Sequence, residues 1–428
     1  MIPIIKKKDI PDFLERFNSR RTAAGSDVTG VVRNILQTVR EKGDRALIDY
    51  TRQLDGADTG SAGLRVSGDD IVTGADETGT AFRDIIMQAA ANIRTFHEKS
   101  KPETWISWEA DGVLLGQRVT PLKRAGIYVP GGRAAYPSSL IMAAVPAMVA
   151  GVAEIAIVSP PDPGGLIHAP VLATAQCLGI TEIYRVGGAQ AIAALAWGTE
   201  TIPAVDIIVG PGNAYVAEAK RQVAGTVRID MVAGPSEVVI LADEHANPDY
   251  IAADLLAQAE HDPLASSILI TDSARLAAKT EKAVTVQGRT LNRRNIFEQS
   301  LKSYGAILIT DHLDEGIDLV NSLAPEHLGL HVEKPWDMLG SIRNAGAVFM
   351  GAWSPETVGD YWAGPNHILP TNRTARFSSP LGTEDFLKRS SLIQYSRTAL
   401  EKNGENIIRF SNMEGLDAHA NAVRQRLR

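Results

Sequence analysis

The segment Glu182-Ile-Tyr-Arg-Val-Gly-Gly-Ala-Gln-Ala-Ile-Ala-Ala-Leu-Ala-Trp197 joins a short β-rich run to an apolar helical run through two glycines. Residues 182–186 predict a strand and residues 189–197 predict a helix, with Gly187 and Gly188 at the turn between them. The same order of strand, turn and helix recurs on both sides of this segment. Strands and helices that alternate at this length indicate right-handed crossovers and a parallel sheet. The pattern therefore predicts an α/β fold.

Strand and helix alternate in two successive series. In the first, strands are expected at 126–129, 155–159, 182–186, 206–209 and 238–241, with helices at 138–149, 169–178, 189–197 and 214–223. In the second, strands are expected at 267–271, 306–310, 328–331 and 347–350. The first 120 or so residues are expected to be mainly helical, with a loop-like stretch at 54–79, and residues 385–428 to be helical and polar. Open parallel sheets bind ligands at the carboxyl ends of their strands, so we expect the site there.

Composition excludes several classes of protein. The 428 residues contain 43 Lys+Arg and 50 Asp+Glu, a net charge of −7, which lacks the basic surface that a nucleic acid would require. Cys177 is the only cysteine, so an intrachain disulfide is excluded and a reducing, cytoplasmic location fits. The longest apolar run, 140–153, contains Pro146 and is shorter than the roughly 20 residues that span a bilayer. We expect neither a membrane span nor a secretion signal.

Three glycine-rich turns follow strands of the first series: Tyr128-Val-Pro-Gly-Gly132, Gly187-Gly-Ala-Gln190 and Gly210-Pro-Gly-Asn213. Glycine after a strand lets the backbone approach a ligand, and the next helix offers its N–H groups to an anion. Such turns suit the phosphates of a dinucleotide. None has the G-x-G-x-x-G spacing with an acidic residue about 20 positions later, so tight turning alone explains them equally well.

A small set of polar side chains stands apart from the solvated histidines. Gln258 and His261 are three residues apart and share a helix face, and Glu326 and His327 are adjacent. Asp360 and His367 lie in a segment rich in Gly, Trp and Pro. Imidazole, carboxylate and amide oxygen suit Zn²⁺ or a similar cation, although a buried hydrogen-bonding role is an alternative and Glu260 or Asp262 would be the more usual ligand. Glu326-His327 also suits acid/base chemistry. The complete set is Gln258, His261, Glu326, His327, Asp360, His367 and His419.

Seven segments together are specific to one family. They are Gly126-Ile-Tyr-Val-Pro-Gly-Gly132, Val186-Gly-Gly-Ala-Gln-Ala-Ile-Ala-Ala-Leu-Ala196, Gly210-Pro-Gly-Asn213, Ala233-Gly-Pro-Ser-Glu-Val238, Ala257-Gln-Ala-Glu-His-Asp262, Ala324-Pro-Glu-His-Leu328 and Asn366-His-Ile-Leu-Pro-Thr371. In this order, from about residue 120 onward, the chain strongly resembles histidinol dehydrogenase. The first third matches more loosely.

The resemblance implies oxidation of L-histidinol to L-histidine by two NAD⁺, through histidinal, as the last step of histidine biosynthesis, with one zinc ion per site. Of the family's catalytic pair, His327 would take the hydroxyl proton, Glu326 would activate the water that hydrates the aldehyde, and His327 would act again as base in the second oxidation. The zinc ligands that the resemblance implies are Gln258, His261, Asp360 and His419.

The resemblance also implies the remaining contacts. Those to NAD would come from Tyr128, Gln190 and Asn213, and those to substrate from Ser236, His367 and Glu414 in addition to His327 and the zinc ligands. The family is a homodimer whose C-terminal segment crosses to the partner, so that Glu414 and His419 would serve the other subunit's site. A related dehydrogenase of a sulfonated diol is the alternative, which the negative charge of Glu414 disfavours. A non-catalytic binding protein of the same fold is a further alternative, which the intact pair Glu326 and His327 disfavours.

The expected fold is α/β, with two Rossmann-like parallel-sheet domains and small helical extensions at both ends. We expect a helical segment at 1–25, a larger α/β domain formed by 26–127 with 237–380, an inserted α/β domain at 128–236, and a helical segment at 381–428 that reaches the partner subunit.

Overall fold

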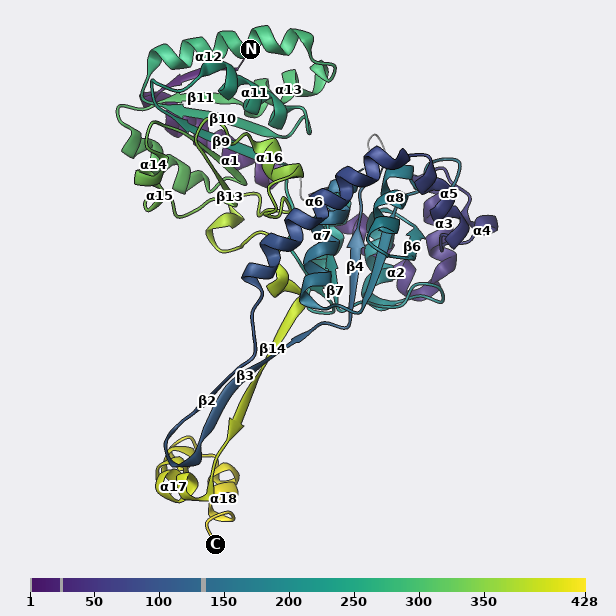
Figure 1. The fold of residues 1–428 in the computed structure, drawn as a ribbon, viewed down its shortest axis with the longest axis vertical. Coiled ribbons are helices and arrows are strands. Elements are labelled where there is room, and N and C mark those ends of the chain that lie inside the picture. The colour runs from purple at the N-terminus through teal and green to yellow at the C-terminus, as the bar shows by residue number, and fades with distance from the viewer. Residues whose placement is uncertain (1, 24–25, 132–135) are drawn as a thin grey trace.

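Two parallel sheets with helices on both faces, and an antiparallel arm, make up the computed structural model (Figure 1). The structure describes residues 2–23, 26–131 and 136–428. Gly132, the last residue of the first glycine-rich turn, lies outside these ranges. None of the helices in the described part of the chain is both long and apolar enough to cross a membrane.

The larger sheet has six parallel strands in the order β1-β11-β10-β9-β12-β13. Their bounds are β1 Ile4–Lys6, β9 Glu237–Ala242, β10 Ser266–Thr271, β11 Ala306–Ile309, β12 His327–His331 and β13 Ala347–Met350. One face packs against α11 (Pro248–Ala259), α12 (Ala274–Gln287) and α13 (Arg294–Tyr304), and the other against α1 (Ile10–Ala23), α14 (Leu313–Leu323) and α15 (Pro335–Leu339). Val238 and Ile240 of β9 contribute to the first face and Val239 and Leu241 to the second. Burial on both faces explains the uninterrupted apolar runs in the sequence.

The smaller sheet has five parallel strands in the order β6-β5-β4-β7-β8. Their bounds are β4 Arg124–Tyr128, β5 Glu154–Ser159, β6 Glu182–Arg185, β7 Ile207–Val209 and β8 Arg228–Ile229. One face packs against α5 (Gly68–Asp76), α6 (Gly79–Ser100), α7 (Pro137–Ala150) and α8 (Ala169–Cys177). The other packs against α2 (Ser26–Lys42), α3 (Asp44–Leu54), α9 (Gly188–Trp197) and α10 (Ala214–Val223).

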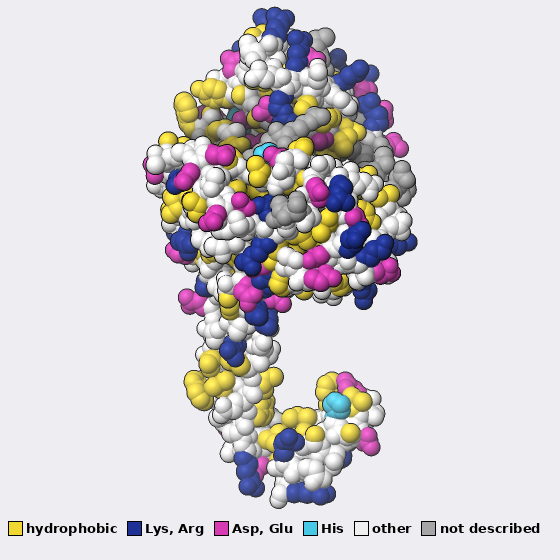
Figure 2. All heavy atoms as spheres, turned by 90° about the vertical axis from the view of Figure 1, so that its right-hand side faces the viewer, with side chains coloured by type: hydrophobic (Ala, Val, Ile, Leu, Met, Phe, Trp, Pro, Cys, Tyr) yellow, Lys and Arg dark blue, Asp and Glu magenta, His cyan; other side chains and the backbone are white. Residues whose placement is uncertain are grey.

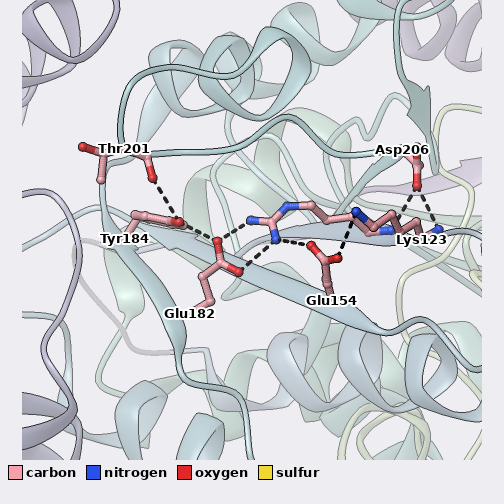
Figure 3. A network of polar contacts seen from close by, with 7 residues as sticks. Lys123, Glu154, Glu182, Tyr184, Thr201 and Asp206 are labelled. Carbon is pink, nitrogen blue, oxygen red and sulfur yellow. Dashed lines mark hydrogen bonds and ion pairs between the residues drawn. The ribbon is translucent and has the colours of Figure 1, made fainter.

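A polar network closes the amino-terminal edge of this smaller sheet (Figure 3). The guanidinium of Arg124 donates to the carboxylates of Glu154, at 2.9 Å, and Glu182, at 3.0 Å. The Asp206 carboxylate accepts from the backbone N–H groups of Lys123 and Arg124. This edge is therefore occupied by the protein's own charges, and the opposite, carboxyl edge carries the glycine-rich turns.

The arm is a three-stranded antiparallel sheet that carries two helices at its far end (Figure 1). The strand order is β14-β3-β2, with β2 at Trp105–Trp108, β3 at Leu114–Pro121 and β14 at Leu387–Gln394. The helices are α17 (Arg397–Met413) and α18 (Asp417–Arg424). The remaining short elements are α4 Thr59–Ala62, α16 Glu356–Tyr361 and 3₁₀ turns at Lys7–Asp9, Ala110–Gly112, Gly288–Thr290, Thr374–Arg376 and Thr383–Phe386.

The α/β fold and both series of strands are confirmed, with several differences from the sequence prediction. The expected helical segment at 1–25 begins with the strand β1, which the pairing with β11 adds to the larger sheet. The expected strand at 238–241 lies at the centre of the larger sheet instead of ending the first series. Helices within 26–100 pack on the smaller sheet, whereas 26–127 was expected to join 237–380. The loop-like stretch at 54–79 contains α5, whose first turn is capped by the Ser67 hydroxyl. The expected helical segment at 381–428 begins with β14, which the pairing with β3 stabilises.

Candidate functional site

A cluster of polar side chains lies where α11 ends and α16 begins. One ligand atom each from His261, Glu356 and Asp360 can be chosen so that all three lie within 4.8 Å of one another. Gln258, in the last turn of α11, is fully buried beside them. With its amide nitrogen facing Glu356, it donates to the two carboxylate oxygens at 2.7 and 3.1 Å, and its amide oxygen points away from that carboxylate. The four groups offer an imidazole nitrogen, carboxylate oxygens and an amide oxygen to a cation.

Glu326 and His327 stand at the start of β12, and both side chains are buried. The Nδ1 of His327 lies 3.1 Å from the carbonyl oxygen of Glu237, which can only accept, so Nδ1 carries the proton and Nε2 is free to accept one. Burial lowers the pKa of His327 to about 3, so the ring is neutral near pH 7. Because the ring is neutral, the 3.8 Å approach of its Nδ1 to the Glu326 carboxylate is not an ion pair.

The Glu326 carboxyl is held by its surroundings. Its Oε2 accepts from the backbone N–H of Glu237 at 2.9 Å. Burial raises its pKa well above the ordinary value, and the hydrogen bonds from Glu237 and from the Ser236 hydroxyl act in the opposite direction. A carboxylate whose pKa is raised becomes a stronger base, which suits activation of water.

His367 connects this cluster to the smaller sheet. Its Nδ1 donates to the backbone carbonyl of Asp360 at 3.0 Å, and its Nε2 lies 3.5 Å from the hydroxyl of Ser139 in the first turn of α7. Burial lowers the pKa of His367 to about 4. A cavity of about 590 Å³, lined by His327, Asp360, His367 and residues of β13 and α6, opens beside these groups. A small polar substrate has room there.

The cluster lies at the amino ends of the six-stranded sheet, which corrects the expectation of a site at carboxyl ends. Ser236 precedes β9, Glu326 precedes β12, and Gln258 and His261 precede β10. The residues predicted to bind the dinucleotide lie instead at the carboxyl ends of the strands of the smaller sheet, as expected for open parallel sheets.

Three glycine-rich turns meet at the carboxyl edge of the smaller sheet. The Tyr128 hydroxyl, at the end of β4, accepts from the Gly188 N–H at 3.1 Å. Gln190 is buried in the first turn of α9, and its Oε1 has no hydrogen-bond partner among the described residues. Asn213 caps α10 by accepting from two backbone N–H groups. Gly210 has φ +111°, and a Cβ there would clash with the Tyr128 carbonyl, so this turn requires glycine.

A buried ion pair holds the turn that begins at Gly210. The ammonium of Lys220 pairs with the Asp230 carboxylate, and both side chains are almost completely buried. Lys220 also donates to the Gly210 carbonyl at 3.0 Å, and Asp230 accepts from the Gly210 N–H at 2.8 Å. The pair thus fixes both backbone groups of Gly210.

Lys220→Met is expected to lower the free energy of unfolding by about 3–5 kcal/mol, because it leaves the Asp230 charge buried without a partner. Urea unfolding measures this loss. The double variant with Asp230→Asn should regain part of it, since the uncompensated charge is gone. A loss below about 1 kcal/mol in Lys220→Met would show that the pair does not stabilise the turn.

Two of the predicted residues lie away from the cluster within one chain. Glu414 directly follows α17 and His419 lies in α18, both exposed, at the far end of the arm (Figure 1). The other predicted residues gather in two places. Gln258, His261, Glu326, His327, Asp360, His367 and Ser236 lie around the buried pair and the cluster, and Tyr128, Gln190 and Asn213 lie at the edge of the smaller sheet.

Comparison with known proteins decides the family. The family profile described as histidinol dehydrogenase matches residues 18–427. The chain belongs to the histidinol dehydrogenase family. It is 55% identical over 404 residues to the histidinol dehydrogenase of Halalkalibacterium halodurans, covering 94% of this chain and 95% of that protein, and 50% identical to that of Bacillus subtilis, covering 97% of each. The crystal structure of histidinol dehydrogenase from Elizabethkingia anophelis superposes with a TM-score of 0.92 at 35% identity, over 100% of this chain and 98% of that one.

Glu356 is a member of the cluster that the sequence prediction missed. It precedes Asp360 by four residues in α16, a spacing that puts both carboxylates on one helix face. That spacing was a usable signal, but α16 is only six residues long and the surrounding Gly, Trp and Pro residues indicate a loop.

Proposed function

We propose that the protein oxidises L-histidinol to L-histidine through histidinal and reduces two NAD⁺. The observation that carries this proposal is a buried acid/base pair, Glu326 and His327, next to the cluster of His261, Glu356 and Asp360. Membership of the histidinol dehydrogenase family supports it independently. The pair also argues against a purely binding role, because general acid/base groups serve proton transfer.

The donor set fits zinc. Imidazole and carboxylate are the common zinc ligands, and Gln258 presents an amide oxygen because Glu356 engages its nitrogen. We assign Gln258, His261 and Asp360 of one chain and His419 of the other as ligands. When bound, zinc supplies a fixed point for the amine and imidazole nitrogens of histidinol and so orients the carbinol carbon.

The chain's own residues move the protons. His327, neutral and with a free Nε2, accepts the hydroxyl proton as hydride leaves the carbinol carbon for NAD⁺. Glu326 then takes a proton from the water that adds to the aldehyde carbon, and the protonated His327 returns its proton to the carbonyl oxygen, so that the neutral hydrate forms and His327 is again free to act as a base. His327 accepts the hydroxyl proton of the resulting hydrate as the second hydride leaves, and the product is the carboxylate of histidine.

The remaining residues bind and orient. Ser236, His367 and Glu414 are proposed to contact histidinol, the Glu414 carboxylate suiting its cationic amine. Tyr128, Gln190 and Asn213 are proposed to contact NAD⁺ at the N-termini of α9 and α10, which favour its phosphates. His367 lies 3.5 Å from Ser139 in α7, the helix that follows β4, so the cluster lies next to the domain that carries the proposed NAD⁺ contacts.

The exposed surface of the arm supports a homodimer. Large apolar side chains on the arm are open to solvent, and Figure 2 shows them gathered there: Trp105, Trp108, Ile393, Phe410 and Met413 are 53–78% exposed. Near the cluster, Trp353 and Tyr361 are exposed as well. Exposed apolar surface of this extent marks an interaction site. We propose that the arm of each subunit lies on the other, bringing Glu414 and His419 to the partner's cluster.

Glu356 acts as a positioning residue in this proposal. Residues that orient a metal ligand are worth about 10–100-fold in metal affinity. Glu356→Ala is therefore expected to weaken zinc binding by about that factor, because the Gln258 amide loses the carboxylate that orients it. Competition with a chelator of known affinity measures the change, and Glu356→Gln should restore part of it.

Glu260→Gln is the matched control for this experiment. Glu260 adjoins His261 in sequence but is not a member of the cluster, so the variant should bind zinc like the wild type. A larger loss in Glu260→Gln than in Glu356→Ala would reverse the assignment.

A substrate comparison tests the proposed activity. The protein should reduce NAD⁺ with L-histidinol and not with a sulfonated diol, since Glu414 would repel the sulfonate. Turnover of the diol alone would overturn the proposal.

A further inference from the structure

Helices α3 and α9 pack against each other. At the beginning of α3, the Asp44 N–H donates to Glu200 at 2.8 Å, and the Asp44 carboxylate accepts from Thr201, just after α9. Because these hydrogen bonds join the start of α3 to the segment after α9, and the two helices are of nearly equal length and contact each other, we infer that they run antiparallel. Asp55, the residue directly after α3, therefore lies near Gly188 at the N-terminus of α9. The negative charge of Asp55 also contributes to raising the pKa of Tyr128, whose hydroxyl accepts from the Gly188 N–H, and this agrees with a position of Asp55 near Gly188.

Two hydrogen-bond acceptors near Gly188 have no partner among the described residues. The first is the Gln190 Oε1, which folds back over Gly188, where a Cβ would lie 2.5 Å from it. Only 1% of Gln190 is exposed to solvent. The second is the Oδ2 of Asp55. Buried acceptors are normally satisfied, so a ligand with hydroxyl or N–H donors is expected here.

The charge of Asp55 makes this ligand specific. Burial raises the pKa of Asp55 to about 6, which leaves the carboxyl ionised near pH 7. A carboxylate next to a βα turn is the group by which dinucleotide-binding sheets hold ribose hydroxyls, while the adjacent helix N-terminus takes the pyrophosphate. The acidic residues about 20 positions after the glycine turns, Asp206 and Asp230, are engaged by backbone N–H groups at the amino edge and by Lys220, and α3 supplies another carboxylate from an earlier part of the sequence.

We propose that Asp55 accepts hydrogen bonds from the adenosine ribose of NAD⁺ and excludes NADP⁺, whose 2′-phosphate its carboxylate would repel. This inference rests on the proposed function of the same edge of the sheet. It adds the residue that selects the cofactor, which the family resemblance did not assign.

Asp55→Asn tests the inference through kcat/KM for NAD⁺ and NADP⁺ at saturating L-histidinol. Loss of a charge-assisted hydrogen bond and of the repulsion should shift the NAD⁺/NADP⁺ ratio about tenfold or more toward NADP⁺. The effect should lie in KM for the nucleotide, with kcat for NAD⁺ close to that of the wild type. Asp49→Asn, an exposed residue of the same helix paired with Arg45, is the matched control and should leave the ratio unchanged.

The wild-type protein gives a test that does not depend on the folding of a variant. By calorimetry without histidinol, it should bind NAD⁺ at least about tenfold more tightly than NADP⁺. Equal binding, or an unchanged ratio in Asp55→Asn, would overturn the role of Asp55. Preferential binding of NAD⁺ without any oxidation of histidinol would instead overturn the proposed function and leave this inference standing.

Discussion

Mixed dimers of His327→Ala and His419→Ala chains are expected to regain activity that neither variant has alone. His327 lies at the start of β12, and His419 lies on α18 at the end of the arm, so each site would combine the first from one chain with the second from the other. Loss of a general base costs about 10²–10⁴-fold in rate, so each variant alone should be almost inactive. In a mixed dimer one site has both wild-type groups and the other has neither. Random mixing should therefore restore up to about one quarter of the wild-type rate.

The control pairs two variants from the same part of the chain. His327→Ala and His261→Ala both alter the site formed by one chain's body, so every site of their mixed dimer lacks one group. That mixture should remain inactive. Recovery there, or verified mixed dimers of His327→Ala and His419→Ala that stay inactive, would contradict a site built from two subunits.

Glu326→Gln is expected to block the second oxidation and spare the first. Glu326 is proposed to act only where water adds to the aldehyde. The amide that replaces its carboxylate in the variant cannot take a proton from that water. Oxidation of histidinal by NAD⁺ should therefore fall by about 10²–10⁴-fold. Reduction of histidinal by NADH, which requires no water, should continue at a rate near that of the wild type. Stopped-flow absorbance of NADH, with histidinal supplied directly, measures both directions.

His327→Ala provides the contrast for this assay. His327 is proposed to move a proton in both oxidations, so its loss should slow the two directions of the assay together. An equal loss of both directions in Glu326→Gln would show that Glu326 does not act on water alone.

Local sequence patterns were sufficient for the strands of both parallel sheets except the short strands β1 and β8, which were not predicted. The runs around Ile127, Ile183 and Ile240 are strands because both of their faces are covered by helices, and the glycine turns follow them as expected. The placement of 26–100 was not predictable in the same way. Val32 and Leu36 form an apolar helix face, but either sheet could bury such a face. The arm was missed because β3 and β14 pair across more than half of the chain.

In the site too, local spacing in the sequence predicted some residues, whereas others are brought together only by the fold. Gln258 and His261 were found from their shared helix face, and Glu326 with His327 from adjacency. The choice of Gln258 over a carboxylate depends on Glu356: a further carboxylate beside Glu356 and Asp360 would add like-charge repulsion, whereas an amide donates to Glu356. Glu356 shares a helix face with Asp360, but its surroundings resemble a loop, and Asp55 reaches its neighbours only through the tertiary fold.

The stoichiometry of NADH to histidine tests the central claim most directly. Purified protein would be given a limiting amount of L-histidinol and an excess of NAD⁺, and both NADH and histidine would be counted at completion. The proposed pair of oxidations at His327, with hydration assisted by Glu326, predicts two NADH for each histidine formed. One NADH per histidinol with release of histidinal, or no NAD⁺ reduction at all, would contradict it.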